Sequence, residues 1–526
     1  MKRIIQFRCV IAASAATIAV MGIVHGAAAQ TPPYLGSFPN FEAHLTPQQL
    51  PGDVAVDLQH RLEREKKFPE VQRLFDLWSW QAFISLNWPT DAAGKRSSDT
   101  TLPPAWSLWT ESTHVFLPKG APPPVCKTGA GVAAAAATNP EITLAHGFTT
   151  RIPEQLDTRR VRLLAVTSAV NDLSALIPTN DISQAFSGPI IDQNGNFVFY
   201  EILIDKHELD YICQNQLYSI AGQKDFATTH SAVDLPSGVD TEDASGAFEL
   251  KLAWKILTPS DDASRYLTAE GKFPSTSTGA APTLSAATTP IGLVGMHIAH
   301  KSASSKQWIW STFEQVDNLA VDSVAHPKLK PSFFDPSCAI CAANQKPAQT
   351  GNTWAKTPNT QIVRSIPIPP DKETLNREAE AALATAGSPL QYYQLIDTQW
   401  PTDPSAPPTA WNAGLPGAVE NKPGGNPTPV FLTNVTMETY FQGPTSTACQ
   451  NEELPTGLKC PAVPWVSATA PNNKDTTVDS TPIFATESCM GCHSSASFAG
   501  AKPIVPGVVT LQLTGDFSWL FSQKAQ

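Results

Sequence analysis

Proline is the feature that most restricts how this chain can fold, because its 47 prolines cannot be accommodated inside regular helices or central strands. Three long stretches combine Pro with Gly, Ala, Ser and Thr and show no apolar periodicity: 119–140, 271–290 and 400–429. Such composition is typical of loops. We therefore expect short helices and strands joined by long connections.

One segment, "FPEVQRLFDLWSWQAFISLNWP" (68–89), predicts a helix. Pro69 suits a first helical turn, and Trp88-Pro89 marks the end. Between them the apolar residues recur at helical spacing: Val71, Leu74, Phe75, Trp78, Ala82 and Leu86.

Three other segments predict strands. Apolar and charged residues alternate in 246–257, Asn194-Gly195 forms a tight turn within 190–204, and 291–316 reads as two strands joined by a polar loop. A short helix is expected from Thr486, and a further helix over 514–526. The predicted class is α+β: a mixed, sheet-rich core with long Pro/Gly/Ala-rich loops and a short helical segment near the C-terminus.

Residues 1–29 have the pattern of a secretory signal peptide. Lys2, Arg3 and Arg8 precede an apolar run from Val10 to Val24, and 27–29 are alanines suited to cleavage before Gln30. The run is short for a membrane span, although an uncleaved anchor is an alternative, and no later stretch is long and apolar enough to cross a bilayer. We expect a signal peptide (1–29), a large α+β domain or two subdomains (30–480), and a C-terminal segment (481–526).

That C-terminal segment contains Cys489, Cys492 and His493 in the spacing C-x-x-C-H. Two thiols two residues apart can each form a thioether to one haem vinyl group, and the adjacent imidazole can ligate the iron. The alternative is a disulfide or a zinc knuckle beside an accidental His. Export favours the haem interpretation.

Through Cys489, Met490, Gly491, Cys492 and His493, the chain resembles the bacterial c-type cytochromes. The resemblance is limited to this motif and fits a large, periplasmic, mono-haem type with the motif near the C-terminus. It implies one haem c attached covalently to Cys489 and Cys492, His493 as proximal iron ligand, electron transfer, and a periplasmic location. It implies no fold, because cytochromes c′, which also carry a late motif, are four-helix bundles.

The resemblance also leaves the distal iron ligand open, since no Met or His follows His493. His297 is the first candidate, because Gly295 and Ala299 flank it on one face of an expected strand and leave room for a macrocycle. The second candidate is Met437. Met296 and His300 follow; they lie on the same expected strand as His297, with side chains on its opposite face. An open or water-ligated iron, or another His, remains an alternative.

Six further cysteines in the exported chain indicate disulfides. Proximity in sequence favours Cys449 with Cys460 and Cys338 with Cys341, which leaves Cys126 with Cys213. The tight C-x-x-C pair at 338–341 could instead be a redox-active dithiol or half of a zinc site.

The function expected from these observations is one-electron transfer by a periplasmic c-type cytochrome. One alternative is a haem-dependent oxidoreductase, a peroxidase or oxygenase, with an open distal site; another is a ligand-binding protein with a haem relay. The formal net charge of −11 argues against nucleic acid and suits a basic redox partner protein. The pairs Trp78/Trp80 and Trp308/Trp310 could flank a haem, but such aromatic residues more often belong to the core.

Overall fold

The structure is a computed structural model that describes most of the chain between Leu50 and Trp400 and parts of the remainder. The described residues are 50–65, 67–128, 141–144, 148–151, 159–164, 188–240, 245–275, 283–284, 287–338, 341–350, 353–355, 357–364, 367–400, 434–441, 489, 493, 496–500 and 513–526. They belong to one unit spanning Pro32–Gln526. The expected signal peptide, most of the Pro-rich stretches, and Cys449, Cys460 and Cys492 lie outside the described residues.

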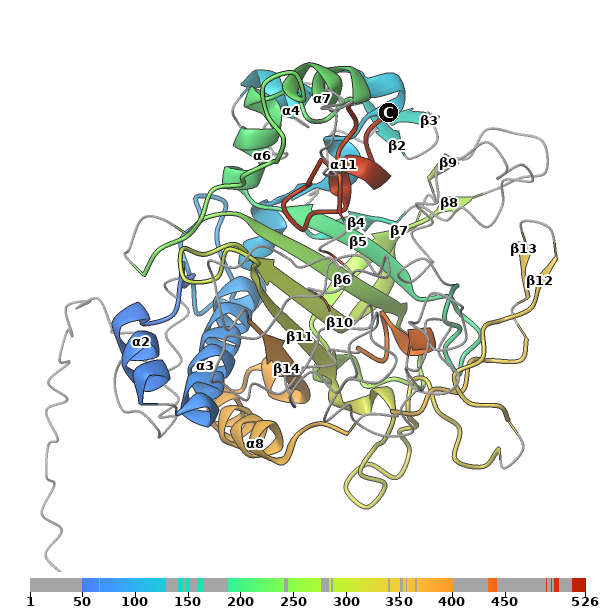
Figure 1. Cartoon of the computed structure of the whole chain (residues 1–526). Coiled ribbons are helices and arrows are strands. Elements are labelled where there is room, and N and C mark those ends of the chain that lie inside the picture. Colours follow the sequence, from blue (N-terminus) through green and yellow to red (C-terminus); the bar gives the residue numbers. More distant parts are fainter. Residues whose placement is uncertain are drawn as a thin grey trace, which may run out of the picture. The chain divides into compact units, whose positions relative to one another are not determined.

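A mixed sheet of eight strands is the central element (Figure 1). Its main order is β1-β5-β6-β10-β11-β14, while β7 pairs with β10 and β4 with β7. The pairs are antiparallel except β4 with β7. The strands are β1 (Thr110–Glu111), β4 (Val161–Leu163), β5 (Phe199–Ile204), β6 (Phe248–Ile256), β7 (Thr268–Lys272), β10 (Thr289–His300), β11 (Ile309–Gln315) and β14 (Tyr393–Gln399).

Short hairpins and helices complete the described structure. The hairpins pair β2 (Glu141–Leu144) with β3 (Phe148–Arg151), β8 (Pro274–Ser275) with β9 (Thr283–Leu284), and β12 (Gln349–Thr350) with β13 (Thr353–Trp354). The α-helices are α2 (Val56–Arg64), α3 (Phe68–Asn87), α4 (Pro124–Thr128), α6 (Lys206–Gln214), α7 (Ile220–Phe226), α8 (Pro370–Thr385) and α11 (Leu520–Gln523). The α+β class with a mixed sheet is therefore confirmed.

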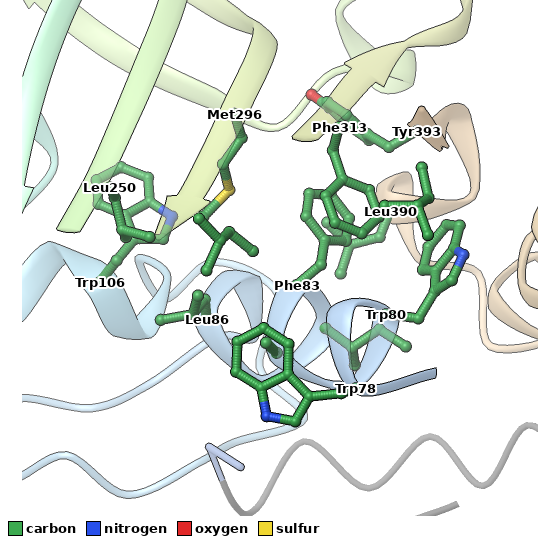
Figure 2. Close-up of a cluster of buried hydrophobic side chains, with 14 of the residues drawn as sticks. Trp78, Trp80, Phe83, Leu86, Trp106, Leu250, Met296, Phe313, Leu390 and Tyr393 are labelled. Carbon is green, nitrogen blue, oxygen red and sulfur yellow. The ribbon is translucent and has the colours of Figure 1, made fainter. Parts of the chain in front are cut away.

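Helix α3 packs against one face of the sheet and matches the predicted helix. Pro69 lies in its first turn and Trp88 follows its last residue. Phe83 of α3 stacks on Phe313 of β11 with ring centroids 4.1 Å apart, and Trp80 donates to the Asn376 side chain of α8 at 3.2 Å. Figure 2 shows this aromatic cluster between helix and strands. The helix is buried over most of its surface because it is covered by the sheet and by α8, and the polar residues among those buried are hydrogen-bonded, as Ser79 is to Ser311.

The predicted strands are present as β6, β10 and β11, and β5 follows the predicted turn at Gly195, whose φ is +81°. Alternation along β10 divides its side chains between the two faces of the sheet. Met296 and His300 face α3, whereas His297 and Ala299 face away from it.

Helices α4, α6 and α7 lie beside the C-terminal residues (Figure 1). A disulfide between Cys126 and Cys213 joins α4 to α6, and the Gln223 side chain of α7 donates to the Phe521 carbonyl at 2.9 Å. The helix expected over 514–526 is shorter than predicted, because only Leu520–Gln523 is α-helical. A tight turn at 515–518 precedes it, with Asp516 and Phe517 at positive φ.

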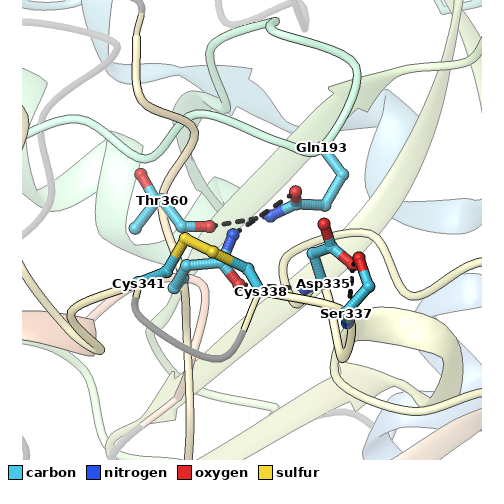
Figure 3. The surroundings of a disulfide bond; sticks show 7 residues. Gln193, Asp335, Ser337, Cys338, Cys341 and Thr360 are labelled. Atoms are coloured by element: carbon cyan, nitrogen blue, oxygen red, sulfur yellow. Dashed lines mark hydrogen bonds between the residues drawn. A yellow bond between two sulfur atoms is a disulfide. The ribbon is translucent and has the colours of Figure 1, made fainter.

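The second disulfide joins Cys338 and Cys341, with Cα atoms 5.6 Å apart. Near this disulfide, the Gln193 side chain donates a hydrogen bond to the Thr360 carbonyl at 2.9 Å (Figure 3). Both disulfides agree with the pairs favoured by the sequence.

The prediction of a loop over 271–290 was wrong in part. Gly271 and Lys272 belong to β7, strands β8 and β9 follow, and 289–290 begin β10. β7 pairs with both β10 and β4, and Pro290 is accommodated because it lies at the start of β10. The prediction over 119–140 was also wrong in part, because α4 lies within it. Within the described residues, no helix is long and apolar enough to cross a membrane.

Candidate haem site

His493 is held in a defined orientation by the C-terminal turn. Its backbone is helical, as is that of Cys489; the other residues of the helix expected from Thr486 up to His493 lie outside the described part of the chain. The His493 Nδ1 atom lies 2.7 Å from the carbonyl oxygen of Phe517. A carbonyl only accepts hydrogen bonds, so in the neutral ring Nδ1 carries the proton and Nε2 carries the lone pair.

The turn that supplies this carbonyl is strained and anchored. Asp516 and Phe517 have φ values of 53° and 66°, in the left-handed region that non-glycine residues rarely adopt. Lys301, which follows β10, binds the Asp516 carboxylate at 2.5 Å, and the Leu235 backbone N–H donates to the same carboxylate at 2.7 Å. These contacts hold the turn in a conformation that its own residues disfavour.

Trp310 of β11 packs against the His493 ring. The two ring centroids are 4.4 Å apart with an angle of 50° between the planes, and Trp308 lies 5.9 Å from Trp310. Trp78 and Trp80, by contrast, belong to the core between α3 and the sheet. The structure thus separates the two Trp pairs: only Trp308/Trp310 adjoins the motif.

The surroundings keep the His493 imidazole neutral. Removal from water is the largest cause that lowers the pKa of His493 to about 4; the neighbouring His297 and Lys251 act in the same direction, whereas the hydrogen bond to Phe517 and the charge of Glu438 oppose it. Neutral imidazole is the form that ligates iron. A ligating His commonly donates its other N–H to a carbonyl, which fixes its tautomer. The described residues of the motif therefore fit a haem whose iron is ligated by His493 Nε2.

His297 lies on the same face of the sheet as Trp310, and it has an acidic partner. Its Nε2 atom is 2.6 Å from Glu438 Oε1, while its Nδ1 atom is buried. Glu438 Oε2 accepts from the Asn434 backbone N–H at 2.9 Å, and the Asn434 side chain donates to Thr312 of β11 at 2.8 Å. Segment 434–441 is thereby fixed over the sheet beside His297.

The sequence suggested that Gly295 leaves space beside His297 for a macrocycle. In the structure, segment 434–441 occupies that space. A side chain at Gly295 would collide with the Thr436 hydroxyl, and Asn434 lies just beyond. The reason given for favouring His297 therefore fails at Gly295. The sequence analysis did not identify Glu438. Its position directly after the candidate ligand Met437 was the one sequence feature that could have indicated a role near the site.

The other distal candidates occupy different environments. The Met296 sulfur accepts from the Asn87 side chain of α3 at 3.3 Å. The His300 nitrogens lie 3.0 Å and 2.7 Å from the carbonyls of Ala247 and Gly52. Both side chains are thus engaged on the α3 face, away from His493.

Met437 is fully buried in an apolar cluster on the same side of the sheet as His297. Of the four distal candidates, the structure therefore brings His297 and Met437 to the face that carries His493.

No protein-family model, curated protein or solved structure matches this chain. Within the described residues, no three His, Cys, Asp or Glu side chains gather as they would around a metal ion. The interpretation of the site depends on the residues around His493.

Proposed function

We propose that this chain is a c-type cytochrome that transfers single electrons through one haem c, attached to Cys489 and Cys492 with His493 as proximal ligand. One observation carries the proposal: the His493 Nδ1 atom, 2.7 Å from the Phe517 carbonyl, leaves Nε2 as the free ligand nitrogen. A zinc-ligating His would be oriented in the same way, so it is the C-x-x-C-H spacing that favours haem over zinc.

Residues of this chain would hold the haem and set the strength of His493 as an iron ligand. The Phe517 carbonyl keeps a proton on Nδ1, which increases the basicity of His493 as a ligand, and Trp310 restricts rotation of the ring. When bound, haem c supplies a one-electron couple. Covalent attachment through Cys489 and Cys492 would retain it through repeated redox cycles.

An exported, periplasmic location belongs to the same proposal. The two disulfides support an oxidising compartment, in which haem c is attached in bacteria. The excess of acidic residues favours a basic redox partner protein, with association that weakens as salt rises.

Haem attachment is tested with two pairs of cysteines of the same spacing. In protein made with the cytochrome maturation system, the red colour should survive extraction with acidified acetone. Replacing Cys489 and Cys492 together by Ala should abolish covalent haem, whereas replacing Cys338 and Cys341 by Ala should not. Full haem content in the first variant would refute the proposal.

A second candidate, a haem-dependent oxidoreductase with an open distal site, is favoured by the His297–Glu438 pair. A carboxylate 2.6 Å from an imidazole is an acid–base couple suited to moving protons, and both groups interact electrostatically with His493. A high-spin spectrum that shifts with carbon monoxide, together with rapid peroxide turnover, would favour this candidate. A low-spin spectrum unmoved by carbon monoxide would favour the electron carrier.

A further inference from the structure

Two acidic side chains, Glu208 of α6 and Glu249 of β6, face each other behind the C-terminal turn. Glu208 is completely buried, and within the described part of the chain the Glu249 carboxyl group is the one hydrogen-bonding neighbour of its carboxyl oxygens, in a contact that requires a proton between the two groups. One oxygen of Glu249 is buried without a hydrogen-bond partner among the described residues. Two adjacent carboxylates in this environment cannot both be ionised without a large cost, so the pair retains a proton.

The charges around the pair are mostly negative. Asp205 begins α6 and holds His207 at 2.6 Å, and Asp516 contributes from the C-terminal turn. Lys301, a cation of this region, is already bound by Asp516 at 2.5 Å and by Asp234 at 2.6 Å.

These surroundings bring the pKa of one carboxyl group of the pair, that of Glu249, close to neutral pH. Burial raises the pKa of Glu249 to about 7, opposed by a hydrogen bond from Ser518. Burial, and next the charge of Glu249, raise the pKa of Glu208 well above its usual value. Glu208 therefore stays protonated while Glu249 ionises near neutral pH.

The pair is connected to His493 through two consecutive residues. Ser518, which donates to Glu249, directly follows Phe517, whose carbonyl accepts from His493 Nδ1. A change of charge at a metal ligated by His493 would therefore act on a poorly solvated carboxyl group across one turn of backbone.

We propose that Glu208 and Glu249 form a proton site linked to electron transfer at His493, so that the protein releases a proton when it gives up an electron. This inference rests on the proposed haem function. The electron passes to a one-electron acceptor and the proton from the carboxyl pair to water. Oxidation adds one positive charge at the iron, which favours the ionised carboxylate. By reciprocity, ionisation of the pair favours the oxidised state, so the midpoint potential falls as pH rises through neutrality.

The test is the midpoint potential, measured by spectroelectrochemistry from pH 5 to 9. The wild type should show a potential that falls with pH around neutrality, and Glu249→Gln should lose that dependence. Asp210→Asn is the matched control, because Asp210 lies on the same helix but pairs with Lys206 on the surface. A flat wild-type profile, or an unchanged slope in Glu249→Gln, overturns the inference. Absence of covalent haem would instead overturn the proposed function.

A second measurement needs no haem. Because the folded-state pKa of Glu249 lies above its ordinary value of 4.5, the folded apoprotein binds more protons than the unfolded chain between pH 4.5 and about 7. Its stability should therefore fall as pH rises through this window. The urea midpoint of apo Glu249→Gln should fall less over the same range, and Glu208→Gln serves if that variant does not fold. Equal pH profiles for wild type and variants would refute the proton site.

Discussion

The Nδ1 atom of His493 lies 2.7 Å from the carbonyl oxygen of Phe517, a residue held at a φ of 66°. The orientation of the candidate iron ligand thus depends on a backbone conformation that phenylalanine rarely adopts. Strain of this kind persists only where surrounding contacts enforce it. The Lys301–Asp516 ion pair is the principal contact of this kind.

Asp516→Ala should destabilise the protein by about 3 kcal/mol, because it removes one partner of a buried ion pair. Lys301 has only 3% of its side chain exposed. Asp234, the other partner of Lys301, is 89% exposed. Asp234→Ala should therefore cost less than about 1 kcal/mol. Urea unfolding of both variants checks this, and equal losses would contradict it.

Trp310→Leu should alter the haem spectrum as well as stability, because Trp310 contacts the His493 ring. Loss of a buried indole should cost about 2 to 3 kcal/mol. Trp80→Leu is the control: Trp80 is fully buried between α3 and α8, so we expect a similar loss of stability with the spectrum unchanged. Matching spectra for wild type and Trp310→Leu would show that the indole does not position His493.

His297→Ala should leave the spin state of the haem unchanged, although the sequence made His297 the first candidate for distal ligand. In the structure its Nε2 is engaged by Glu438 and its Nδ1 is buried. The visible spectrum, with and without carbon monoxide, tests this. Conversion to a high-spin, carbon-monoxide-binding form with the covalent bond intact would show that His297 does ligate the iron.

The two described disulfides should contribute unequally to stability. The Cys126–Cys213 bond closes a loop with a sequence separation of 87, whereas Cys338–Cys341 spans 3. Loop-closure entropy gives about 4.5 kcal/mol for the first bond and about 2 kcal/mol for the second. Paired Cys→Ser variants compared by urea unfolding measure the difference, and a larger loss from the 338–341 pair would be the contrary result.

Local features of the fold could be predicted from the sequence because their signals lie within the segments themselves. Helical spacing and Pro69 located α3, and alternation located β6. The segment 514–526 was misread because its apolar residues suit a helix, whereas Asp516 is drawn into a turn by Lys301, far away in sequence.

The candidate site could be predicted only where one segment contains the whole signal, as at Cys489, Cys492 and His493. Glu438 approaches His297 across a sequence separation of 141, and Glu249 of strand β6 meets Glu208 of helix α6. Long-range contacts of this kind depend on sheet order, which no short pattern encodes.

The largest apolar cluster, between α3 and the sheet, includes no described residue beyond Trp400. Among the described residues, the core around α3 therefore includes none from the segment that carries His493. In a chain that emerges from its N-terminus, this core can form while Cys489 and Cys492 are still accessible to an attaching enzyme. Cofactor loading would then be a late event on a largely folded polypeptide, and closure of the 515–518 turn on His493 would complete maturation.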